Sequence, residues 1–200
     1  MHTSLLIVGA LLPMVSAAVY VWAIVRGPVR PQRMTRFLLA AIGALSLASL
    51  FASGDRAGLW LAVTSFIESA VIWVLSWWRG IGGRDPLDIA CLVLCGVGVA
   101  WWIASGDSMA GLIASCVADL IACIPSFVKT VRLPHTESGL FYLLGTLAGL
   151  CIALAGPYGW QQLLFPVYIL FINAVFMLAI WRPSRLRKRI APDAAEAPAL

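Results

Sequence analysis

Charged residues are scarce in this sequence, and so are histidines. Asp, Glu, Lys and Arg make up only 12% of the 200 residues, whereas soluble domains usually contain about 25%. The histidines are limited to His2 and His135, and no HExxH, Walker A or GxSxG motif is present. We therefore expect neither an enzyme nor a cofactor. An intramembrane enzyme is the remaining alternative, and two carboxylates inside apolar segments are the sole sequence feature that supports it.

The cysteines form neither a metal-binding nor a disulfide pattern. No CxxC pair or Cys/His cluster occurs, and all five cysteines lie in apolar segments: Cys91, Cys95, Cys116, Cys123 and Cys151. Cysteine in such surroundings behaves as a small packing residue. We expect no disulfide and no metal site.

Apolar residues, by contrast, make up 62% of the chain, and the mean hydropathy is +0.94. They recur in runs of roughly 20 residues, the length that crosses a hydrocarbon core about 30 Å thick. Lipid offers the backbone no hydrogen-bonding partners, so such runs must be helical. The sequence predicts an all-α membrane protein with seven transmembrane helices near 4–26, 36–53, 58–78, 87–104, 108–129, 138–155 and 161–181. The first run lacks a basic segment before it, so we expect a retained span and not a signal peptide.

Basic residues predict the orientation. All but one of the 14 Lys and Arg residues lie in the first, third and fifth loops or after the last span, and Arg56 is the exception. Positive loops face the cytoplasm, so we expect an integral protein of the cell (inner) membrane with its N-terminus outside and its C-terminus inside. The net charge of +5 is then a topology signal, and no nucleic-acid partner is expected. The basic and then Ala/Pro-rich segment 185–200 is predicted to be a disordered cytoplasmic tail.

Two halves of the chain resemble each other at an offset of about 105 residues. Three pairs carry the similarity: Arg26-Gly27-Pro28 with Arg132-Leu133-Pro134, Gly43 with Gly149, and Phe66-Ile67-Glu68 with Phe171-Ile172-Asn173. The offset predicts two parallel three-helix repeats, 1–80 and 107–184, joined by a linker helix in 81–106. Ala52-Ser53-Gly54-Asp55 also recurs at 104–107, which similar outer turns would explain.

This arrangement of three, one and three spans resembles the SWEET and PQ-loop transporter superfamily. Pro125-Ser126, followed by Lys129, Arg132 and Glu137-Ser138-Gly139, is similar to the PQ motif and the residues after it. Ser126 replaces the Gln of the motif, Val19 stands where the first half would carry the proline, and Pro31-Gln32 lies in a loop. The resemblance implies a membrane transporter in which the third and seventh spans supply paired polar residues. Asn173 matches that pattern, whereas Glu68 departs from it.

Four unusual residues occur at similar depth in odd-numbered spans. Pro13, Glu68, Asp119 and Asn173 each lie about 15 Å below the outer end of their span, at a rise of 1.5 Å per residue. A charge at this depth costs about 2.5–3.5 kcal/mol and usually faces a cavity or a partner. The alternative is a structural role, with a buried carboxyl kept protonated.

We therefore predict a substrate-binding site formed by Glu68, Asp119, Asn173 and the deep Trp73, although Trp73 also fits a packing role. Pro125 and Pro13 are the candidate hinges, since proline removes a helix hydrogen bond. The predicted function is transport of a small solute, coupled to a proton or cation through this polar site. The alternative is a non-transporting membrane module, such as an accessory subunit or a receptor-like protein. The expected partners are the lipid bilayer and a small solute, and a homo-oligomer is left open.

Overall fold

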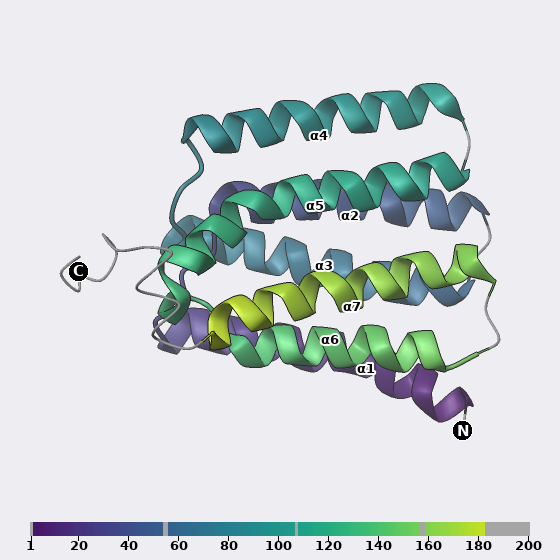
Figure 1. The fold of residues 1–200 in the computed structure, drawn as a ribbon, viewed down its shortest axis with the longest axis horizontal. Coiled ribbons are helices and arrows are strands. Elements are labelled where there is room, and N and C mark those ends of the chain that lie inside the picture. Colours follow the sequence, from purple (N-terminus) through teal and green to yellow (C-terminus); the bar gives the residue numbers. More distant parts are fainter. Residues whose placement is uncertain (1, 54–55, 107, 157–158, 183–200) are drawn as a thin grey trace.

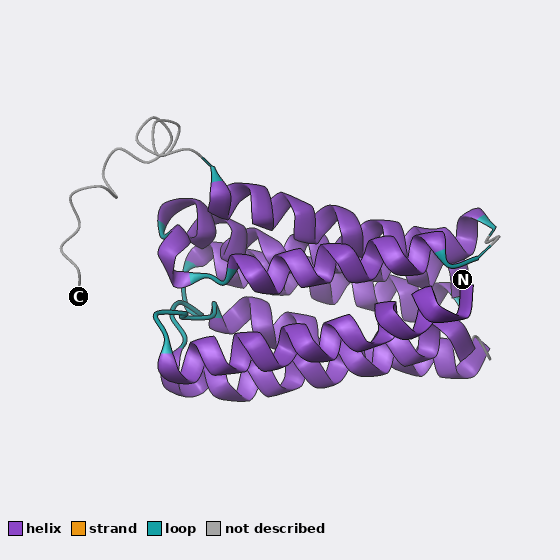
Figure 2. Cartoon of the chain, turned by 90° about the horizontal axis from the view of Figure 1, so that it is seen from below, coloured by secondary structure: helices purple, strands orange, loops and turns teal. Residues whose placement is uncertain are grey.

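A computed structural model describes residues 2–53, 56–106, 108–156 and 159–182. This part of the chain is helical, and it contains no strand beyond an isolated bridge between Gln32 and Ile81. Figure 2 shows that the axes of the helices are roughly parallel to one another. In chain order they are α1 (His2–Arg26), α2 (Arg33–Ser53), α3 (Arg56–Arg79), α4 (Pro86–Ser105), α5 (Ser108–Arg132), the 3₁₀ turn η1 (Pro134–Thr136), α6 (Gly139–Leu154) and α7 (Trp160–Trp181).

Each apolar run of the sequence corresponds to one of these helices, with ends within about three residues of those predicted. Among the described residues, four helical segments have the length and composition of membrane spans: Ser4–Arg26, Pro86–Ser105, Leu112–Arg132 and Gln162–Trp181. Gly139–Leu154 is apolar but shorter, and at 1.5 Å per residue α6 is only about 24 Å long. The all-α fold is confirmed, and its long apolar helices fit a membrane protein.

The outward faces of the bundle are apolar. Large hydrophobic side chains on several helices are more than half exposed, including Trp22, Val93, Ile103, Phe171 and Leu178. A soluble protein rarely leaves so much contiguous apolar surface in water. These faces fit contact with lipid acyl chains.

Successive helices run in opposite directions, so the α1–α2, α3–α4 and α5–α6 connections gather at one end (Figures 1 and 2). We call this end, which carries Arg26, Arg30, Arg79, Arg84, Arg132 and Arg182, the basic end. The connections there are tied together by backbone hydrogen bonds. Ile81 N donates to Pro31 O at 3.0 Å, and Arg30 N donates to Thr136 O at 3.0 Å. Pro31-Gln32 thus belongs to a loop, as the sequence indicated.

The helix contacts follow the same pattern in two groups of three. α3 packs against α1 and α2, and α7 packs against α5 and α6. Between the groups, α1 lies against α6 and α2 lies against α5. α4 packs mainly on α5 and lies at the edge of the bundle (Figure 1). If α1, α2 and α3 are exchanged with α5, α6 and α7 respectively, the main contacts within and between the two groups stay the same.

Glycines allow the closest of these contacts. A Cβ atom at Gly149 of α6 would lie 2.7 Å from Leu170 N and 2.9 Å from Pro166 O of α7. A Cβ at Gly145, one turn earlier, would lie 2.6 Å from Oδ1 of Asn173. Gly145 and Gly149 lie four residues apart and both face α7, so this spacing of small residues allows close helix packing.

Candidate functional site: a polar cavity inside the bundle

A cavity of about 130 Å³ lies inside the bundle and is lined by every helix except α4. Such a space holds several water molecules. Its wall includes all four residues that the sequence placed at one depth: Pro13 of α1, Glu68 of α3, Asp119 of α5 and Asn173 of α7. The expectation that Glu68, Asp119 and Asn173 share one cavity is confirmed. Their role in substrate binding stays a prediction.

Helical periodicity explains why these side chains reach the same space. On α3, Ser65 and Ser69 line the cavity together with Glu68. Ser65 lies three residues before Glu68 and four residues before Ser69. On α5, Cys123 and Ser126 follow Asp119 by four and seven residues and line it too. Residues three, four and seven apart share one helix face. Each of these helices therefore presents a polar stripe to the interior, although its outer surface is apolar.

Glu68 is the carboxylate without an internal partner. It is half-buried near the middle of α3, and no hydrogen bond or ion pair joins its carboxyl group to another residue of the described chain. A carboxylate in a low-dielectric interior is costly when it is unpaired. Its free acceptor sites therefore remain for water, a proton or a bound group.

Asp119 differs because it already has partners. The hydroxyl of Tyr168 on α7 donates to Oδ2 of Asp119. The Cys123 thiol lies 3.9 Å from the same oxygen. Asp119 also lines a neighbouring cavity of about 60 Å³, which shares Leu39, Ser65, Ser69 and Ile169 with the first. The carboxylate thus lies where the two cavities meet.

Asn173 is positioned by its own helix and by a glycine opposite. Its Nδ2 donates to Ile169 O at 2.9 Å, which leaves the amide oxygen toward Gly145. Any side chain at Gly145 would displace the amide, because the nearest approach would be 2.6 Å. The glycine on α6 therefore makes room for the polar residue on α7.

Arg36 also lines the cavity, and the sequence analysis had assigned it to the first loop. It lies in the first turns of α2 and is only 4% exposed. Its guanidinium carbon lies 4.8 Å from the ring centre of Tyr20 and 5.5 Å from that of Phe141. Nε of Arg36 and Oγ1 of the adjacent Thr35 are buried without a hydrogen-bond partner in the described chain. Burial of a cation with rings as its neighbours is unusual, since buried charges are normally paired.

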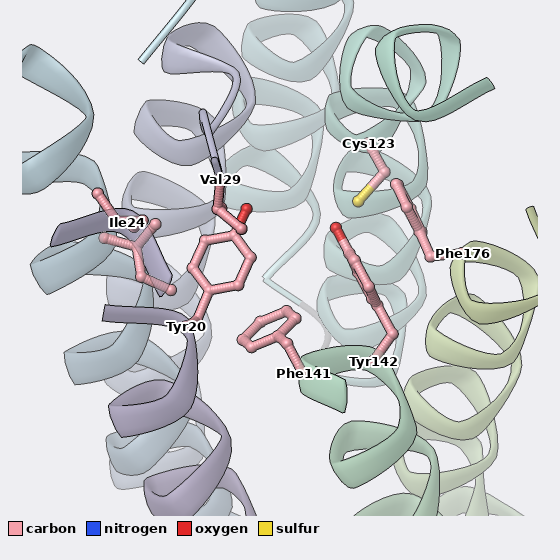
Figure 3. Packing of buried hydrophobic residues seen from close by; sticks show 8 residues of the cluster. Tyr20, Ile24, Val29, Cys123, Phe141, Tyr142 and Phe176 are labelled. Atoms are coloured by element: carbon pink, nitrogen blue, oxygen red, sulfur yellow. The ribbon is translucent and has the colours of Figure 1, made fainter. Parts of the chain in front are cut away.

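An aromatic cluster separates the cavity from the basic end. Tyr20, Phe141 and Tyr142 form it with Phe176, and Figure 3 shows Phe141 between the two tyrosine rings. The ring centres of Tyr20 and Phe141 are 4.4 Å apart, and those of Tyr142 and Phe176 are 4.7 Å apart. Close packing of four rings leaves little room for a solute to pass in this conformation.

A buried ion pair lies beyond the rings. Lys129 of α5 donates to Oε1 of Glu137 and, at 2.6 Å, to Arg30 O. The hydroxyl of Tyr20 donates to Oε2 of Glu137 at 2.7 Å. These bonds join α1, the α1–α2 connection, α5 and the segment before α6. The sequence analysis treated Lys129 as a loop residue, whereas it is buried in the last turn of α5.

The remaining predicted residues are placed as follows. Trp73 is not among the described residues that line the cavity, and its ring packs 5.5 Å from that of Phe37. This contact fits the packing alternative. Pro13 and Pro125 both lie inside helices, and Figure 1 shows bends in the N-terminal part of α1 and the C-terminal part of α5. Proline accounts for such bends because it removes a backbone hydrogen bond. Movement at either position stays a prediction, and the tail beyond residue 182 lies outside the described residues.

Comparisons of the chain with protein-family models, with curated proteins and with solved structures found no match. The function is therefore argued from the cavity itself.

Proposed function

We propose that the chain is a SWEET-like membrane transporter that moves a small solute through the central cavity. One observation carries the proposal: a polar cavity at mid-height of an apolar bundle, lined from both groups of three helices by Glu68, Asp119 and Asn173. Polar groups at this depth are costly unless they serve a pathway or a bound molecule. Transporters built from repeats place their substrate site at this level.

The pattern of helix contacts supports two parallel repeats, α1–α3 and α5–α7, with α4 as the linker. In each group the third helix packs against the other two, and the contacts between groups, α1 with α6 and α2 with α5, exchange under the same swap. A Cβ atom at Gly43 of α2 would lie 3.5 Å from Cα of Phe66 on α3, so Gly43 faces the third helix of its group as Gly149 faces α7. Under this proposal all seven helices cross the membrane, with the N-terminus outside.

In an alternating-access mechanism, the packed residues between the cavity and the basic end would act as a barrier that opens and closes. The proposal assigns the basic end to the cytoplasm, because positive loops are retained there. The aromatic cluster and the Lys129–Glu137 pair then form a cytoplasmic barrier. The smaller cavity around Asp119 extends the polar space away from that barrier, since its wall includes Ser115 and Phe165, which lie closer to the other end of their helices. Opening at the basic end would require the pair to separate, with Pro125 as the hinge in α5.

Flux measurements test the proposal. Purified protein in liposomes should take up at least one solute from a pooled panel of sugars, amino acids and organic acids, read by mass spectrometry of the lumen. Glu68→Gln, which keeps the shape but removes the charge, should reduce the uptake, whereas Arg84→Gln in the exposed α3–α4 loop should not. If the protein adds nothing to the uptake by empty liposomes, transport is wrong and a receptor-like or accessory role takes its place.

A further inference from the structure

We propose that the cavity binds a small zwitterion, a solute carrying one carboxylate and one ammonium group, with the carboxylate on Arg36 and the ammonium on Glu68. The inference rests on the proposed function, because it names the solute class that the cavity would take. The sequence analysis did not include Arg36 in the site.

The first step concerns the positive charge. Arg36 is almost fully buried, yet its Nε has no hydrogen-bond partner in the described chain, and neither does Oγ1 of Thr35 beside it. Both residues line the cavity. Buried donors are nearly always satisfied, so these two adjacent groups point to a bound acceptor. A guanidinium recognises a carboxylate through two parallel N–H donors, which gives the contact both strength and orientation.

The second step explains why the guanidinium stays available. Its nearest neighbours are the rings of Tyr20 and Phe141, whose faces attract a cation. Glu137, the acidic residue beyond those rings, is already bound by Lys129 and Tyr20. The structure therefore holds Arg36 in place and leaves its Nε without a partner in the described chain.

The third step concerns the negative charge. The carboxylate of Asp119 accepts a hydrogen bond from Tyr168, whereas that of Glu68 has no partner in the described chain. Glu68 and Arg36 line one cavity, yet no ion pair forms between them: the salt bridge found among the described residues is Lys129–Glu137. Two opposite charges held apart across a small polar space match the two ends of a zwitterion.

Other solute classes fit less well. A solute with only a negative group would meet Arg36 but also two carboxylates, and a solute with only a positive group would lie near an unpaired guanidinium. A neutral sugar would leave the charges of Arg36 and Glu68 without counterions in a low-dielectric site. A zwitterion supplies a counterion to both Arg36 and Glu68 and leaves the net charge of the cavity unchanged.

Binding to the purified full-length protein in nanodiscs tests the inference. Thermal stabilisation by glycine, L-alanine, L-serine, L-proline and glycine betaine is compared with that by propionate, ethylamine and glucose at equal concentration. Propionate and ethylamine each lack one of the two charges of alanine. We expect at least one zwitterion to stabilise the protein and the three comparison compounds to have no effect.

Variants assign the two ends. Arg36→Gln should weaken zwitterion binding by about tenfold to a hundredfold, the loss expected for a charge-assisted hydrogen bond, and should shift the preference toward ethylamine. Glu68→Gln should shift it toward propionate, and Arg84→Gln should bind as the unaltered protein does. A reversed preference cannot result from misfolding. If Arg36→Gln does not fold, Arg36→Lys should still weaken the zwitterion, because an ammonium group lacks the paired donors.

The outcomes separate this inference from the proposed function. If glucose binds and is taken up while none of the zwitterions binds, the zwitterion site is wrong and transport stands. If a zwitterion binds equally well to Arg36→Gln, Arg36 does not hold it and the assignment is overturned. If a zwitterion binds as expected but the liposomes show no flux, the site stands and transport fails.

Discussion

The Lys129–Glu137 pair offers the sharpest test of how this bundle is held closed. The side chain of Glu137 is fully buried and that of Lys129 is 7% exposed. Glu137 accepts hydrogen bonds from Lys129 and Tyr20, and the Tyr142 hydroxyl lies 3.5 Å away. Replacing Glu137 by Ala would leave a buried ammonium group with Arg30 O as its remaining strong acceptor.

The expected magnitude follows from that burial. Removing one partner of a buried ion pair costs about 3–5 kcal/mol, because the other charge remains uncompensated. A change of 1 kcal/mol moves the midpoint of a 150–250-residue protein by about 2–4 °C, so Glu137→Ala should lower the apparent Tm by roughly 6–20 °C. Lys129→Met should have an effect of the same order. The double variant should lose far less than the sum of the two, since no unpaired charge remains.

Thermal unfolding of purified protein, followed by the fluorescence of its nine tryptophans, measures all three variants. Arg84→Gln, in the exposed α3–α4 loop, is the matched control and should unfold with the unaltered protein. Additive losses in the double variant would refute the reasoning, because they would mean that the two side chains contribute independently. A Glu137→Ala variant as stable as the unaltered protein would refute it as well.

Three further predictions rest on single contacts. Gly149→Ala should destabilise the protein by about 1–3 kcal/mol, because its Cβ would meet α7 backbone atoms at 2.7 Å. Gly96→Ala, whose Cβ would meet nothing within 4 Å, is the control and should be neutral or stabilising by up to about 1 kcal/mol. Equal unfolding midpoints for the two variants would contradict the close α6–α7 contact. Tyr168→Phe should lower stability by about 1–3 kcal/mol, because it removes the hydroxyl that donates to Asp119; an unchanged midpoint would show that water replaces it. Asp88→Ala should loosen the α3–α4 connection, because this carboxylate accepts from Gln32 at 2.8 Å and from Gly83 N at 2.7 Å; faster proteolysis of that loop is the readout, and unchanged cleavage would contradict it.

The helices could be predicted from sequence because two independent signals coincide. Apolar runs set their lengths, and Gly, Pro and Asp mark the breaks, as at Gly80 to Pro86. The shared depth of Glu68, Asp119 and Asn173 followed from counting residues along helices of equal direction. What depth cannot supply is the direction in which a side chain points. Trp73 was assigned to the site on depth alone, yet it lies five residues from Glu68 and so about 140° around the helix.

The contacts that could not be predicted join residues far apart in sequence or depend on where a helix begins. Tyr168 and Asp119 are 49 positions apart and meet because α7 packs on α5. Arg36 was counted as a loop residue because the second span was expected to begin there. The helix begins at Arg33, so Arg36 lies a turn inside it and its side chain enters the bundle. Because the helix starts three residues earlier than expected, Arg36 lines the cavity and does not belong to the loop.

Under the proposed repeat, the two groups of helices share a scaffold but differ in the residues that line the cavity, and this difference bears on what the cavity can bind. At the offset of about 105 residues, three pairs of corresponding positions all line the cavity: Pro13 with Asp119, Arg36 with Tyr142, and Glu68 with Asn173. In every pair one member carries a carboxyl or guanidinium group, and the other carries neither. Two identical repeats would present the same charge twice, as a symmetric solute requires. Here each charged member corresponds to an uncharged one, so a solute would meet a different group at each end of the cavity.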